Sequence, residues 1–177
     1  MEPEKCLTME TELAKIETVS FYEDRLICPI LNYEPFVIVN QVIELIGLFP
    51  QRAMLDLRNN PRLSKWIFLF SIKKDQNSKT DVPIWVCQFD KNGEKSQFFV
   101  QIDTQTEAFF ENLKGYSYAV LPVRKFTAWL YGISPERVKP EIRPNLERYQ
   151  DFCDEILFEY FLAPLQNAKI CWGKRFN

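Results

Sequence analysis

The stretch AWLYGISPERVKPEIRPNLERYQ, residues 128–150, decides how the C-terminal part of this chain folds. A helix is predicted to end at Gly132, and Ser134 followed by Pro135 is typical of an N-cap with proline in the first helical position. A second, long helix is expected from about 140 to 161. Its apolar residues recur at spacings of three or four, as on one buried helix face: Ile142, Leu146, Tyr149, Cys153, Ile156, Leu157 and Tyr160.

Upstream of this stretch, short runs of apolar, aromatic and β-branched residues predict strands. Residues 18–39 contain three such runs with a turn at Asn32–Pro35, and the next runs are 66–72, 82–89 and 96–102. Asn92 and Gly93 predict a hairpin turn. A helix or loop is expected at 103–115, a strand at 118–122 and a helix at 123–132. The fold class predicted is α+β, with one or two antiparallel sheets against which the long C-terminal helix packs.

Two helical segments separate the first strands from the later ones. Asn40 stands where an N-cap is expected for a helix over 41–46, which Gly47 ends, and a second helix is predicted from 51 to about 58. Two short helices with a tight turn between them predict a helix-turn-helix. If that unit contacts DNA, its candidate residues are Arg52, Arg58, Asn59, Asn60 and Arg62.

Composition bounds the function. The 177 residues carry 22 basic and 24 acidic side chains, a formal charge of −2, so no global positive field attracts nucleic acid or an anionic membrane. The five cysteines are irregularly spaced, which predicts reduced thiols and a cytoplasmic protein. No run approaches the roughly 20 apolar residues of a membrane span.

Catalysis is disfavoured by the residue types that are missing. The chain has no histidine, so the commonest general base and a usual zinc ligand are absent, and its five glycines are scattered. A glycine-rich phosphate loop therefore cannot be formed. We expect no enzymatic activity, no metal and no cofactor.

The C-terminal block resembles the N-terminal domain of temperate-phage antirepressor proteins. The residues that carry the resemblance are Leu121-Pro122, Trp129-Leu130-Tyr131-Gly132-Ile133, Arg137-Val138-Lys139-Pro140-Glu141-Ile142-Arg143 and Arg148-Tyr149-Gln150. The likeness covers roughly residues 18–72 and 118–161. It implies an acidic extension at 1–17, a domain at 18–162 with an inserted β and helical segment at about 73–117, and a tail at 163–177.

The resemblance implies a prophage control protein that binds a phage-type repressor and relieves its repression of transcription. Clustered cations at the start of the long helix are the candidate partner-binding residues: Arg137, Lys139, Arg143 and Arg148. The simpler interpretation is a solvated face whose ion pairs contribute about 0.3–0.5 kcal/mol each. A sequence-specific DNA-binding regulator that uses the 40–60 helix-turn-helix is the alternative, and a homo-oligomer stays open.

Overall fold

The computed structural model describes residues 14–21, 23–75, 81, 83–112 and 117–162. The rest of the expected N-terminal extension, the C-terminal tail and parts of the 73–117 segment lie outside the described residues. Within them the strands are β1 (Ala14–Phe21), β2 (Asp24–Leu31), β3 (Glu34–Ile38), β4 (Phe68–Lys74), β5 (Trp85–Lys91), β6 (Glu94–Val100) and β7 (Tyr118–Pro122).

The helices alternate with groups of strands. They are α2 (Val39–Ile46), α3 (Pro50–Asn59), α4 (Thr104–Asn112), α5 (Val123–Tyr131) and α6 (Arg143–Leu157), which continues as a π-helical turn (Phe158–Leu162). Two 3₁₀ turns, Ser64–Trp66 and Pro135–Arg137, lie before β4 and α6.

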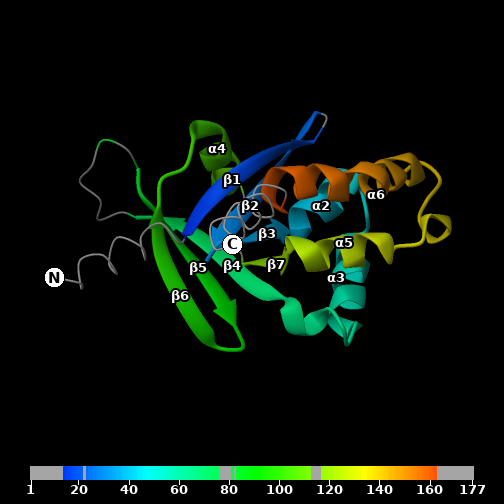
Figure 1. The fold of residues 1–177 in the computed structure, drawn as a ribbon, viewed down its shortest axis with the longest axis horizontal. Helices are drawn as coiled ribbons and strands as arrows, with labels where there is room; N and C mark the ends of the chain where they lie inside the picture. The colour runs from blue at the N-terminus through cyan, green and yellow to red at the C-terminus, as the bar shows by residue number, and fades with distance from the viewer. Residues whose placement is uncertain (1–13, 22, 76–80, 82, 113–116, 163–177) are drawn as a thin grey trace, which may run out of the picture.

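The strands form one sheet in the order β1-β2-β3-β7-β4-β5-β6, and every neighbouring pair is antiparallel. The predicted α+β class with an antiparallel sheet is thereby confirmed. β7 lies between β3 and β4, although it is far from both in sequence. It joins the strands β1 to β3 to the strands β4 to β6. The sheet curls, so its edge strands β1 and β6 approach each other (Figure 1).

Two tight turns set the register of the hairpins. Asn32 and Tyr33 have φ of 52° and 65°, and Asn92 and Gly93 have φ of 56° and 90°. Positive φ at both central residues is the backbone of a type I′ turn, whose twist matches that of the flanking strands. The predicted turns are found, although Pro35 belongs to β3, where it pairs with Ile30.

Each face of the sheet has its own core. Inside the curl, aromatic residues such as Phe36, Phe70 and Phe89 pack together, and Phe110 of α4 contacts Phe70. On the other face, β1, β2, β3 and β7 pack against α2, α5 and α6 (Figure 1). This second core holds α2, α5 and α6 against the sheet.

One of the two predicted N-caps is found in its predicted position. Asn40 is not an N-cap, because α2 begins at Val39 and Asn40 lies inside the helix; its Oδ1 accepts a hydrogen bond from the Ala119 amide of β7 at 2.8 Å. Ser134 does occupy the N-cap position of the 3₁₀ turn, with Pro135 next, as predicted, but in the described residues its side chain makes no capping hydrogen bond.

The last helix is shorter than expected. α6 begins at Arg143 and not near 140, because residues 139–142 form a turn in which the Ile142 and Arg143 amides both donate to the Lys139 carbonyl. Leu146 and Tyr149 are fully buried against the core. Tyr160 is not part of the buried stripe, since it is 44% exposed and its hydroxyl donates to Glu17 at 3.1 Å.

Candidate partner-binding surface

The corner between α5 and α6 is held by a buried amide. Gln150 of α6 donates from Nε2 to the Leu130 carbonyl at 3.0 Å and to the Ile133 carbonyl at 2.7 Å. Leu130 lies in the last turn of α5 and Ile133 lies just after the helix, so neither carbonyl has the usual helical partner four residues on. One side chain thus satisfies both of them and fixes the corner.

Arg143 is tied into the same corner. It is half-buried, and its Nε donates to the Pro135 carbonyl of the 3₁₀ turn at 2.9 Å. The guanidinium therefore closes the loop back onto the start of α6, and its loss would leave the Pro135 carbonyl without this donor.

Arg148 is also engaged inside the molecule. Its Nη2 lies 4.0 Å from Asp24 Oδ2 at the start of β2. The same carboxylate oxygen accepts a hydrogen bond from the Tyr149 hydroxyl at 2.7 Å. Burial, together with this hydrogen bond, raises the pKa of the Tyr149 hydroxyl. The group joins α6 to the β1–β2 hairpin.

The other two predicted partner-binding residues are exposed. Arg137 ends the 3₁₀ turn and Lys139 follows it, and both side chains face solvent. The structure thus brings Arg137, Lys139 and Arg143 together at one corner, with Arg148 more than a turn further along α6.

The DNA-binding candidates lie on and just after α3. Arg52, Arg58, Asn59 and Arg62 are exposed. Asn60 has a local structural role, because its Oδ1 accepts hydrogen bonds from the Arg62 amide at 2.9 Å and the Leu63 amide at 3.2 Å. Such a side-chain turn ends α3 and leads the chain towards the 3₁₀ turn at Ser64–Trp66.

α3 also exposes apolar side chains that the sequence analysis did not select. Phe49, directly before the helix, is 67% exposed and Leu55 is 57% exposed, while Leu57 is the buried residue of this helix. A shallow hollow of about 400 Å³ is lined by Pro50, Gln51, Met54, Leu55 and Arg58. The sequence signal for this surface was the pair Phe49-Pro50 directly before a helical segment with few apolar residues. We call the exposed residues Phe49, Arg52, Leu55 and Arg58, together with this hollow, the α3 surface.

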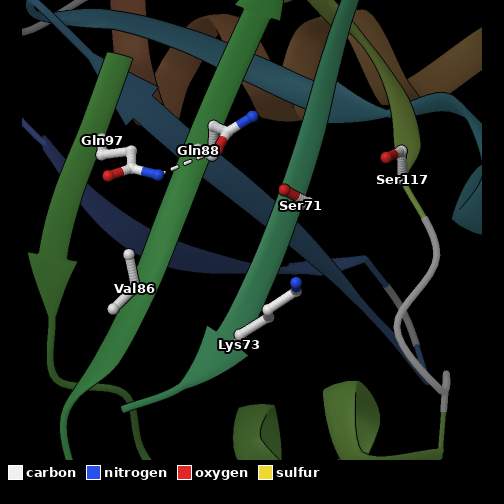
Figure 2. Close-up of a pocket in the computed structure, with 6 residues that line it drawn as sticks. All are labelled: Ser71, Lys73, Val86, Gln88, Gln97 and Ser117. Atoms are coloured by element: carbon white, nitrogen blue, oxygen red, sulfur yellow. Dashed lines mark hydrogen bonds between the residues drawn. The ribbon is translucent and has the colours of Figure 1, made fainter. Parts of the chain in front are cut away.

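A second hollow lies over β4, β5 and β6 (Figure 2). It has a volume of about 240 Å³ and is lined by Ser71, Lys73, Val86, Gln88, Gln97 and Ser117. Gln97 Nε2 donates to Gln88 Oε1 across the two strands at 3.0 Å. This volume is below the range of roughly 300–1,000 Å³ for ligand pockets, and the lining offers polar contacts without a paired nucleophile and base.

The described cysteines are buried thiols. Cys28, Cys87 and Cys153 form no disulfide and are at most 2% exposed. Burial raises the pKa of Cys87 to about 11 and raises that of Cys28 further. Such thiols are poor nucleophiles because the thiolate is the reactive form. Within the described ranges no group of three or more metal-ligating side chains occurs, and no helix there has the length and apolarity to cross a bilayer.

The fold is a small α+β domain, and its candidate binding residues are exposed side chains at the α5–α6 corner and on the α3 surface. Residues 81–166 match the family described as the P22_AR N-terminal domain. The match over this range confirms the predicted resemblance to the phage antirepressor N-terminal domain. The matched range contains the α5–α6 corner and residues 81–117, whereas the α3 surface precedes it. No curated protein and no solved structure matches the chain.

Proposed function

We propose that this domain is a phage antirepressor-like regulator that binds a phage-type repressor in the cytoplasm and thereby relieves repression of transcription. The single observation that carries the proposal is the family match over residues 81–166. Binding alone suffices for this role, so the proposal contains no catalytic step and needs no cofactor.

The exposed surfaces support a protein partner. Phe49 and Leu55 are large apolar side chains left in solvent, with Arg52 and Arg58 on the same helix. Aromatic residues and arginine are enriched at the centres of protein interfaces. We propose the α3 surface as one contact region and the exposed pair Arg137 and Lys139 as another.

Direct DNA binding through α3 is the alternative. The exposed Arg52, Arg58 and Arg62 could contact phosphates. However, the formal charge of −2 gives no long-range attraction to DNA, and exposed Phe49 and Leu55 would meet a polar, hydrated groove. The observations therefore favour a protein partner.

An operator-release experiment tests the proposal. Each phage-type repressor encoded in the same genome is bound to its labelled operator, and the purified chain is added in increasing amounts. We expect the operator to be released from one repressor, and the chain to bind that repressor without DNA. A shift of operator DNA by the chain alone, weakening steeply with salt, would replace the proposal with the DNA-binding alternative. Failure to bind any of the repressors would contradict the proposal.

A further inference from the structure

Three cations surround one indole ring at the junction of β4, β5 and α5. The Lys91 Nζ lies 5.4 Å from the centre of the Trp66 ring, the Lys125 Nζ lies 4.8 Å from it, and the Arg124 Cζ lies 5.2 Å from it. Lys91 Nζ is also 4.9 Å from the centre of the Phe68 ring. We call this group of five residues the Trp66 cluster. Because all three cations lie within 5.4 Å of the same ring centre, they are also close to one another.

The positive charge of the cluster is incompletely neutralised within the described chain. Arg124 pairs with Glu34 at 3.0 Å, and its side chain is still 58% exposed. Among the described residues neither lysine forms a salt bridge, although Glu34 pairs with the neighbouring Arg124 and Glu94 stands opposite Lys91 in the β5–β6 hairpin. Like charges gathered around one ring repel one another, and dissolved salt screens this repulsion.

The position of the cluster adds to this repulsion. Arg124 and Lys125 lie in the first turn of α5, whose first turn holds no acidic residue. A cation there faces the positive end of the helix dipole, which favours anions. Attraction of a cation to an exposed aromatic face, about 0.5–1 kcal/mol, offsets part of the cost. The arrangement is therefore better suited to receiving negative charge than to stabilising the isolated domain.

We propose that the Trp66 cluster is a docking site for an acidic polypeptide segment, a run of Asp and Glu side chains on a protein partner. Carboxylates would pair with Lys91, Lys125 and Arg124, while the half-buried rings of Trp66 and Phe68 supply apolar contact. The site rests on the proposed function only in that its occupant is a protein.

A polypeptide fits the cluster better than a nucleic acid strand. Proteins that bind single strands use open aromatic faces for base stacking and a long positive groove along the phosphates. Here the indole is half-buried and flanked by its own cations, and the charge is concentrated around one ring. Closely spaced carboxylates complement that geometry.

The test uses a fluorescein-labelled peptide of ten residues in which Asp and Glu alternate with Ala, and the full chain. Fluorescence anisotropy at low salt should show binding that weakens as salt rises. The double variant Lys91→Gln, Lys125→Gln should lose at least fivefold in affinity. The matched control Lys73→Gln, Lys95→Gln removes the same charge from exposed positions on β4 and β6 and should stay within twofold of the unchanged chain.

Three results would overturn the proposal: no peptide binding at low salt, equal loss in both double variants, or tighter binding of a single-stranded oligonucleotide of equal charge. The variant Lys91→Arg, Lys125→Arg keeps the charges and should retain binding, which separates a charge effect from a folding effect. The peptide assay needs no repressor, so its failure is distinguishable from failure of the operator-release experiment.

Discussion

The segment that forms the α5–α6 corner and α6 and the segment that forms the α3 surface both contain arginines, but these arginines have different roles in the structure. At the corner, Arg143 donates to a backbone carbonyl, and further along α6 Arg148 lies beside Asp24, so both are part of the fold. On α3, Arg52 and Arg58 are exposed beside exposed apolar side chains. Similar residue types thus stabilise the domain in one place and remain available to a partner in the other.

The difference shows that a count of cations cannot locate an interface. A guanidinium has five donors, and a nearby carbonyl or carboxylate at a helix start is an effective acceptor for them. Whether such an acceptor is nearby depends on the path of the chain, which the spacing of arginines does not reveal. Exposed apolar residues beside free cations are the more informative combination.

The largest effect should come from the buried side of α6. Leu146→Ala removes a fully buried side chain and leaves a cavity, so the free energy of unfolding should fall by about 2–5 kcal/mol. Leu55→Ala on α3 should change it by no more than about 0.5 kcal/mol. Urea denaturation of both variants measures the contrast, and equal losses would show that α3 is packed in a way the structure does not have.

Gln150→Leu should have the next largest effect. The substitution fills the buried position with an apolar side chain of similar size but leaves the Leu130 and Ile133 carbonyls without the Nε2 donor, which should cost about 1–3 kcal/mol. The melting temperature should drop by several degrees. An unchanged melting temperature would mean that the corner does not depend on this residue.

A comparison within the corner is finer. Arg143→Ala should cost about 1 kcal/mol because it removes a partly buried hydrogen bond to Pro135. Arg137→Ala should change the free energy of unfolding by less than about 0.5 kcal/mol, since that side chain is exposed. If Arg137→Ala were the more damaging variant, the assignment of structural and free arginines would be reversed.

The last effect concerns pH and is absent at neutral pH. Burial raises the pKa of Cys87 from 9.0 to about 11, so the folded state favours the neutral thiol. This contribution to stability is complete below the unfolded pKa and is lost as the pH rises from about 9 to about 11. The decline in unfolding free energy across that window should be smaller in Cys87→Ala. An identical decline in both proteins would contradict the shift.

Much of the fold followed from the sequence. Runs of apolar, aromatic and β-branched residues and the Asn92-Gly93 pair predicted strands and a hairpin because local residue types control both. Helix starts were less predictable: Asn40 bonds to Ala119, a partner 79 positions away, so no local pattern could show that its side chain was engaged elsewhere. The insertion of β7 between β3 and β4 is likewise a long-range pairing.

The candidate surfaces were less accessible to sequence reasoning. Arg137 and Lys139 were selected by charge alone, and they are exposed as a binding role requires. Phe49 and Leu55 were not selected, because large apolar residues are usually buried. The Trp66 cluster combines residues from three separate segments, which only the folded chain brings together.

The central claim is that the domain binds a phage-type repressor through its exposed surfaces. The most direct measurement is the affinity of the chain for the repressor that it releases from the operator, compared with that of the variant Phe49→Ser, Leu55→Ser. The account predicts that this variant melts within a few degrees of the unchanged chain but binds the repressor at least tenfold more weakly, about 1.4 kcal/mol. Unchanged affinity in a folded variant would contradict the assignment of the α3 surface, and the absence of any repressor binding by the unchanged chain would contradict the central claim itself.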